Sequence, residues 1–347
     1  MISKLGGRRD KRRSSRSTVP RLAWPLGGLA VASVVAIVVA VSVGTSGLGI
    51  RARQSDDVHR NHLSRTTTTA TATTMQPVPQ PPYAIESETI TLDDPTRDTP
   101  ARGDVPGASG RVLVTDIRRP IGPRGPLPLV VFAHGWNSNP TADETLLDSW
   151  AAAGYLVAAP VFPDSTDTLP GTPVSNYPEQ ALDLSFIITS MLGGRAGPVD
   201  PNRIAVAGHS DGGTDIALLA LNPSYADHRI RAYLSLSGEI PAGVPGPWGV
   251  ATPGSLLVAV GTDDQYGLLV RSTQVFDTAN TTAKVLLRVT GGDHLEMYVG
   301  SSPEAMALRA DTVLFLNDAL RPAGATSAQL LSALEQSGQP SIVVSNN

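Results

Sequence analysis

The sequence contains no cysteine, which excludes both disulfide bonds and thiolate metal sites. Its histidines and carboxylates show no metal-ligand spacing on a common helix, so we predict neither a metal ion nor a cofactor. Positive charge is scarce in most of the chain. Residues 1–53 hold 10 of the 27 Lys and Arg but only one of the 31 Asp and Glu, which leaves 17 basic and 30 acidic residues beyond them. A body with that excess of negative charge is unsuited to binding nucleic acid.

Near its start the chain has an uncharged apolar run, residues 22–43. As a helix this run would span about 33 Å, enough to cross the core of a bilayer. The basic segment before it, 1–21, predicts a cytoplasmic N-terminus by the positive-inside rule. We therefore expect a single-pass signal-anchor in the cell membrane, with the rest of the chain outside the cytoplasm. The alternative is a cleaved signal peptide and a secreted protein, with Ala40-Val41-Ser42 as a small-residue cleavage site.

Residues 44–82 are rich in polar residues, threonine and proline, and include the stretch Gln76-Pro-Val-Pro-Gln-Pro-Pro82. Such a composition cannot bury much apolar surface and favours an extended, disordered chain. We interpret this segment as a stalk that holds the following domain away from the membrane. The other interpretation is disorder without a spacing role.

Residues 83–322 have the pattern of one large α/β domain. Apolar runs bounded by turn residues predict strands at 87–92, 111–117, 127–133, 155–160, 203–207, 231–237, 255–260 and 284–290. The later runs are apolar on both faces, as expected of central parallel strands covered by helices. Three helices are predicted between and after them. The first is opened by a capping box, Thr141-Ala-Asp-Glu144, and ends at Gly154. The second has one apolar face, and the third spans 304–320. The apolar face consists of Leu184, Ile187, Ile188, Met191 and Leu192.

Around residue 210 the chain reads as strand, tight turn and helix, with Gly208-His-Ser-Asp-Gly212 at the turn. This is the G-x-S-x-G pattern of a nucleophile elbow, in which a sharp turn exposes the serine and leaves no room for side chains at the glycines. The pentapeptide by itself is a weak signal. The sequence nevertheless indicates Ser210 as a nucleophile, because suitable partners follow downstream in the right order.

A serine nucleophile needs a base and a carboxylate that orients the base. His294 follows the late strand 284–290 on a glycine turn, where it could swing over the sheet, and is the candidate base. The strand 255–260 leads into Gly261-Thr-Asp-Asp264, which offers Asp263 and Asp264 as the carboxylate. The residues themselves do not distinguish between the two.

Acyl transfer also needs hydrogen-bond donors for the developing oxyanion. The backbone N–H of Asp211 follows the nucleophile directly, and that of Trp136 follows the strand 127–133. The Trp136 ring could also form a flat wall for the substrate, although plain core packing is the alternative for a tryptophan. Four neighbours on the same loops are candidate substrate-binding residues: His134, Gly135, His209 and Tyr266.

Four motifs together resemble the α/β-hydrolase superfamily, and most of all its branch of dienelactone hydrolases, chlorophyllases and cutinase-like polyester hydrolases. They are FAHGWN at 132–137, GHSDGG at 208–213, GTDD at 261–264 and GGDH at 291–294, in family order. The resemblance implies a mostly parallel, doubly wound sheet without a large cap. It also implies a Ser210–Asp264–His294 triad, because the acid of that branch lies three residues after the glycine. It places the second oxyanion donor on Trp136.

These observations predict an enzyme of the carboxylesterase or lipase type that cleaves a small-molecule, lipid or polymer ester through an acyl-enzyme. The alternatives are an acyltransferase of the same fold, and a catalytically idle domain displayed for binding, whose signature would be a missing triad member. The loop 238–254, rich in proline and glycine, is too short for a helical lid, so we expect an open cleft. We expect a monomer. The tail 323–347 has no assigned role, although Leu330, Leu331 and Leu334 could lie on a short helix.

Overall fold

A computed structural model describes residues 82–250, 252–322, 324–337 and 342–345. The chain divides into two compact units, 1–74 and 75–347, and the described residues belong to the second. The predicted cytoplasmic segment, the membrane helix at 22–43 and almost the whole stalk at 44–82 therefore lie outside the described residues. No helix within the described residues has both the length and the apolar character needed to cross a bilayer.

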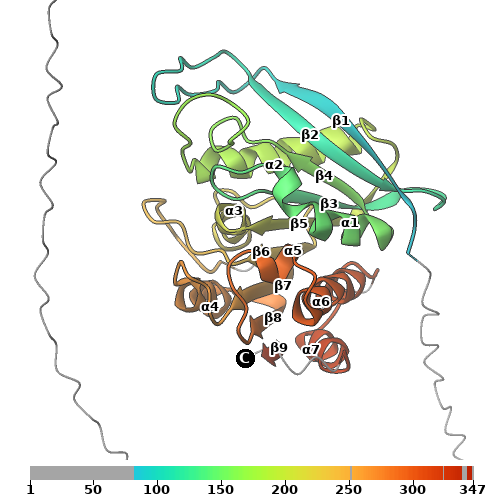
Figure 1. The fold of residues 1–347 in the computed structure, drawn as a ribbon. Coiled ribbons are helices and arrows are strands. Elements are labelled where there is room, and N and C mark those ends of the chain that lie inside the picture. Colours follow the sequence, from blue (N-terminus) through green and yellow to red (C-terminus); the bar gives the residue numbers. More distant parts are fainter. Residues whose placement is uncertain (1–81, 251, 323, 338–341, 346–347) are drawn as a thin grey trace, which may run out of the picture. The chain divides into compact units, whose positions relative to one another are not determined.

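The described residues form a nine-stranded sheet with the order β1-β2-β4-β3-β5-β6-β7-β8-β9 (Figure 1). Strands β3 to β8 run parallel, while β1 and β2 at one end and β9 at the other are antiparallel to their neighbours. The predicted parallel centre of the sheet is thus confirmed. The strands are β1 Ile85–Asp94, β2 Arg111–Pro120, β3 Leu127–Ala133, β4 Leu156–Pro160, β5 Val199–His209, β6 Ala232–Leu236, β7 Thr252–Gly261, β8 Thr281–Val289 and β9 Ile342–Ser345.

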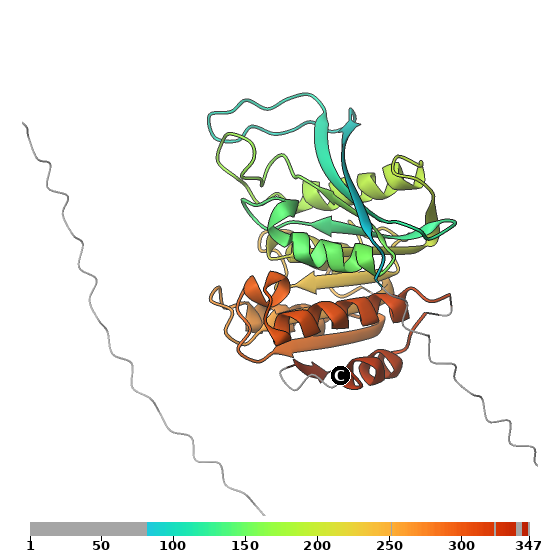
Figure 2. The ribbon, with the colours of Figure 1, turned by 45° about the vertical axis from the view of Figure 1, so that its right-hand side comes forward.

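Helices cover both faces of this sheet (Figures 1 and 2). One face packs against α2 Tyr177–Leu192, α3 Asp211–Leu221 and α4 Leu268–Thr278. The other packs against α1 Glu144–Ala152, α5 Glu296–Val299, α6 Pro303–Ala319 and α7 Ser327–Glu335. Every residue of β4 and β6 is buried, which explains their continuous apolar runs, since a strand between two helical layers has no solvent face.

Two predictions about elements are wrong. Thr141-Ala-Asp-Glu144 does not cap α1; instead Asn139 accepts a hydrogen bond from the Thr141 N–H and opens the short 3-10 helix η1 (Pro140–Asp143), which leads into α1. The domain also does not end at residue 322. Leu330 and Leu334 of α7 are buried in the core, and β9 pairs with β8, so the described part of the 323–347 tail belongs to the fold.

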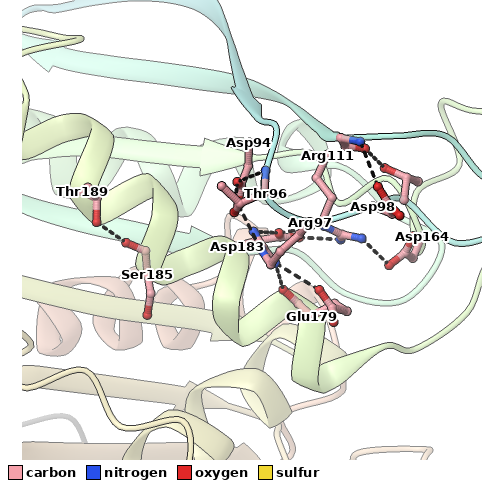
Figure 3. Close-up of polar contacts among 12 residues, drawn as sticks. Asp94, Thr96, Arg97, Asp98, Arg111, Asp164, Glu179, Asp183, Ser185 and Thr189 are labelled. Carbon is pink, nitrogen blue, oxygen red and sulfur yellow. Dashed lines mark hydrogen bonds and ion pairs between the residues drawn. The ribbon is translucent and has the colours of Figure 1, made fainter.

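A buried network of ion pairs fixes the antiparallel end of the sheet to α2 (Figure 3). Arg111, at the start of β2, pairs with Asp183 of α2 at 2.6 Å and with Asp164 in the loop after β4 at 3.0 Å. Arg97 adds a second cation on Asp183 at 2.7 Å. Because each charge has a partner, the desolvation cost of burying them is offset. The network fixes the 161–176 loop, which reaches the site described next.

Candidate active site

Ser210 lies on a sharp turn between β5 and α3, with φ 59° and ψ −120°. Few non-glycine residues adopt this backbone, and it costs on the order of 1–3 kcal/mol. The surroundings hold it there. The Ser210 N–H donates to the carbonyl of Leu236 at 2.9 Å, and neighbouring backbone packs closely against Gly208 and Gly212. A Cβ on Gly208 would lie 2.2 Å from the Gly212 carbonyl oxygen, and one on Gly212 would lie 2.0 Å from that of Ala133. Only glycine fits at these two positions.

His294 and Asp264 form a hydrogen-bonded row with the serine. The Ser210 Oγ lies 2.9 Å from His294 Nε2, and His294 Nδ1 lies 2.8 Å from Asp264 Oδ2. The Asp264 side chain is fully buried, and the backbone N–H of Tyr266 donates to its other oxygen. Asp263 is exposed and accepts only from the Thr262 hydroxyl among the described contacts. Of the two carboxylates that the sequence left open, Asp264 is the one in contact with the imidazole.

The environment of His294 favours the neutral imidazole. Burial, the largest influence, lowers the pKa of His294; the hydrogen bond to Asp264 opposes this shift, and the nearby His209 adds to it. The net effect is a pKa of His294 below the ordinary value for histidine. A neutral imidazole whose Nδ1–H is bound by a carboxylate presents its Nε2 lone pair to the serine hydroxyl, which is the arrangement of a general base.

Two backbone N–H groups beside Ser210 have no acceptor within the described part of the chain, those of Trp136 and Asp211. Asp211 is the first residue of α3, so its N–H is one of the donors that a helix N-terminus leaves unpaired. Trp136 follows Gly135, where an added Cβ would lie only 3.2 Å from the Cβ of Ser210, so this loop passes close to the serine. These donors are therefore available to an oxyanion formed at the serine.

Two aromatic residues on the loops of the site have exposed side chains. The Trp136 side chain is 53% exposed, which makes it surface-facing rather than part of the core. Tyr266 is 61% exposed and its ring meets that of His294 edge-on at 4.6 Å between centroids. Gly135 thus lies against the serine and Tyr266 against the imidazole, while Trp136 is the exposed residue that follows Gly135.

Two of the predicted substrate-binding residues are in the wrong place for that role. His134 is buried: its Nε2 accepts from the Phe162 N–H at 3.0 Å and its Nδ1 lies 2.8 Å from the Gly135 carbonyl oxygen. Burial lowers the pKa of His134 to about 4, so it is neutral and structural. His209 is 5% exposed and turned beneath His294. Neither ring is available to a substrate, because both nitrogens of each are in contact with protein atoms.

Sequence reasoning missed several groups of the site. Asp143 of η1 contacts His209, and the Asp211 carboxylate accepts hydrogen bonds from the hydroxyls of Ser175 and Tyr177. Burial raises the pKa of Asp211. No spacing rule links positions 143 and 175 to residue 210, since their meeting depends on the fold. Among the described residues, no group of three His, Asp or Glu side chains could hold a metal ion.

Comparisons with known proteins give a fold but no family assignment. No protein-family model matches the chain, and no curated protein matches it. Among solved structures, it is similar to a ferulic acid esterase from Streptomyces cinnamoneus, with a TM-score of 0.54 and 20% sequence identity over 71% of this chain and 92% of that one. This likeness shows that the chain has an α/β-hydrolase fold. At such low identity it does not carry a substrate across.

Proposed function

We propose that the protein is a serine esterase, which cleaves carboxylic ester bonds through an acyl-enzyme on Ser210. The observation that carries this proposal is the uninterrupted row Ser210 Oγ, His294 and Asp264, with contacts of 2.9 and 2.8 Å. A serine on a strained elbow, a neutral base and a buried carboxylate are the parts that nucleophilic acyl transfer requires. The α/β-hydrolase fold, shared with a solved ferulic acid esterase, supports the same reaction class.

In the first half-reaction, Ser210 Oγ attacks the ester carbonyl carbon while its proton passes to His294 Nε2. The carbonyl oxygen becomes an oxyanion that accepts from the backbone N–H groups of Trp136 and Asp211. Asp264 stays ionised and stabilises the imidazolium. Collapse of the tetrahedral intermediate breaks the C–O bond to the alcohol, and His294 returns the proton to that oxygen.

In the second half-reaction, water attacks the acyl-enzyme carbonyl and gives a proton to His294. Collapse of this intermediate breaks the C–O bond to Ser210 Oγ, His294 returns its proton to that oxygen, and the carboxylic acid is released. Residues 237–250, between β6 and β7, form no helix, so no helical lid from this loop covers the serine. This supports a site that admits bulky esters. We further propose that residues 22–43 anchor the enzyme in the membrane with its catalytic domain outside the cytoplasm.

The test is the Ser210→Ala variant assayed with p-nitrophenyl esters and with a fluorophosphonate probe. We expect hydrolysis to fall by roughly 10⁴–10⁶-fold, because loss of the nucleophile removes the covalent route. Ser301→Ala is the matched control, since Ser301 is exposed and none of the described hydrogen bonds joins it to Ser210, His294 or Asp264. The probe should label Ser210 in the wild type but not in His294→Ala. Unchanged hydrolysis by folded Ser210→Ala would refute the proposal, and preferential transfer to an added alcohol over water would indicate an acyltransferase.

A further inference from the structure

A second histidine, His209, lies next to His294. His209 Nε2 is 2.7 Å from the backbone carbonyl oxygen of His294, and the two rings are 4.9 Å apart between centroids. On its other side, His209 Nδ1 is 3.2 Å from Asp143 Oδ1, which comes from η1. The ring is also 4.9 Å from that of Tyr298 in α5. The reaction steps above use neither His209 nor Asp143, although both are almost completely buried.

Both neighbours of the His209 ring nitrogens can only accept hydrogen bonds. A backbone carbonyl has no proton to give, and neither has an ionised carboxylate. A neutral imidazole carries one N–H and one lone pair, so one of its nitrogens would point a lone pair at an oxygen lone pair. The doubly protonated ring satisfies both contacts. Asp143 has the complementary need, since its Oδ1 is buried without another hydrogen-bond partner among the described residues and lies 3.2 Å from His209 Nδ1.

We propose that His209 and Asp143 form a buried imidazolium–carboxylate pair that positions His294 for its role as the base. The His209 Nε2–H holds the backbone of the loop that carries His294, and the carboxylate of Asp143 holds His209. The inference rests on the proposed function, because it assigns a role within the same site. His209 is a positioning residue: it precedes Ser210 in the chain, but its ring is buried and its two nitrogens contact Asp143 and the His294 carbonyl.

The pair also has an electrostatic consequence for the base. The charged or titratable groups that face His209 are Asp143 from η1, His294 after β8, Asp264 after β7 and Tyr298 from α5. Burial lowers the pKa of His209, but Asp143 and the His294 carbonyl outweigh it, so the net shift is upward. Burial raises the pKa of Tyr298, which stays neutral. A cation beside His294 disfavours a second cation there, so His294 remains neutral, and able to act as a base, at lower pH than an isolated histidine.

The first experiment compares pH profiles of kcat/KM for the wild type and His209→Gln. Glutamine keeps an amide donor but cannot carry a charge. We expect the acidic limb to begin below about pH 6.5 in the wild type and to move upward by roughly one pH unit in the variant. His228→Gln, at an exposed loop histidine, is the matched control and should leave the limb in place. An unmoved limb in folded His209→Gln would overturn the proposal.

The second experiment takes its decisive measurement on the wild-type protein. In wild-type protein labelled with ¹⁵N-histidine, proton–nitrogen correlation spectra should show one histidine, in contact with the Tyr298 ring, that keeps both ring protons above pH 7. In Asp143→Asn the same ring should lose one proton near neutral pH. A singly protonated His209 at pH 7 in the wild type contradicts the inference. This spectrum does not depend on turnover, so it separates failure of the inference from failure of the esterase proposal, which Ser210→Ala tests.

Discussion

At the scale of single residues, the site depends on which groups the fold leaves unpaired and which it encloses. Ser210 is held in a strained backbone conformation by hydrogen bonds and by two glycines that admit no side chain. Beside it, the N–H groups of Trp136 and Asp211 remain without acceptors among the described residues. By contrast, every polar atom of the His294 ring is engaged. The strained backbone and the unpaired N–H groups both lower the stability of the folded state. Both lie at the serine, where the proposed acyl transfer would use them.

The two adjacent aspartates give a residue-scale prediction with its own control. Asp264→Asn should lower kcat by roughly 10³–10⁴-fold, because an amide cannot stabilise the imidazolium and can favour the wrong tautomer of His294. Asp263→Asn should change kcat by less than about twofold, since Asp263 is exposed and does not touch the imidazole. Steady-state kinetics of both variants decide the matter. Greater damage at Asp263 than at Asp264 would mean that the observed row is not the working one.

Sequence patterns locate the row but not its surroundings. Ser210 and His294 follow apolar runs that end in glycine turns, and such signals are local in the chain. The substrate-binding roles predicted for His134 and His209 are wrong because a motif does not tell which way a ring points. The His209 ring is buried in contact with Asp143, which lies 66 positions earlier in the chain. A contact of that kind is visible only after the fold has formed.

At the scale of elements, the central parallel strands are predictable, because strands such as β3, β4 and β6 are buried along almost their whole length and therefore read as continuous apolar runs. The helix α4 was not predicted. Its buried stripe consists of Leu268, Ser272, Val275 and Phe276, so a serine interrupts the apolar pattern. That serine is buried because its hydroxyl donates to the Gly238 carbonyl at 2.6 Å, a partner that no local pattern reveals. The strand β9 was missed because four residues are too few to show a period.

The C-terminal helix α7 gives the prediction at this scale. Leu330→Ala should lower the free energy of unfolding by about 2–4 kcal/mol, because the Leu330 side chain is fully buried against α6 and β8 and the truncation leaves a cavity. Leu331→Ala, at the neighbouring half-exposed leucine, should cost about 1 kcal/mol or less. Urea denaturation of the two variants measures both changes. Equal, small effects would indicate that α7 is not part of the cooperative fold.

At the scale of the whole molecule, the site and residue 83, near the start of the described domain, lie at opposite ends of the parallel strands. Ser210, Gly135 and His294 follow the carboxyl ends of β5, β3 and β8. The Tyr83 N–H donates to the Ala152 carbonyl at 2.8 Å, and its ring contacts Gly154, just before the amino end of β4. Because β3, β4 and β5 are parallel, residue 83 lies near their amino ends, whereas the site lies at their carboxyl ends. The proposed anchor and the proposed catalytic row would then belong to opposite ends of these strands.

That separation leads to a prediction about the intact protein. Protease added outside intact cells should cut within residues 44–82 and release a soluble domain that still hydrolyses esters, because the hydrogen-bonded row and the core lie beyond the cut. Activity in the membrane fraction before treatment and in the supernatant afterwards is the measurement, with a cytoplasmic enzyme as the control for lysis. Release without protease would favour a cleaved signal peptide over an anchor. Activity confined to the cytosol would contradict the proposed topology, because the basic segment 1–21 would then have failed to orient the chain.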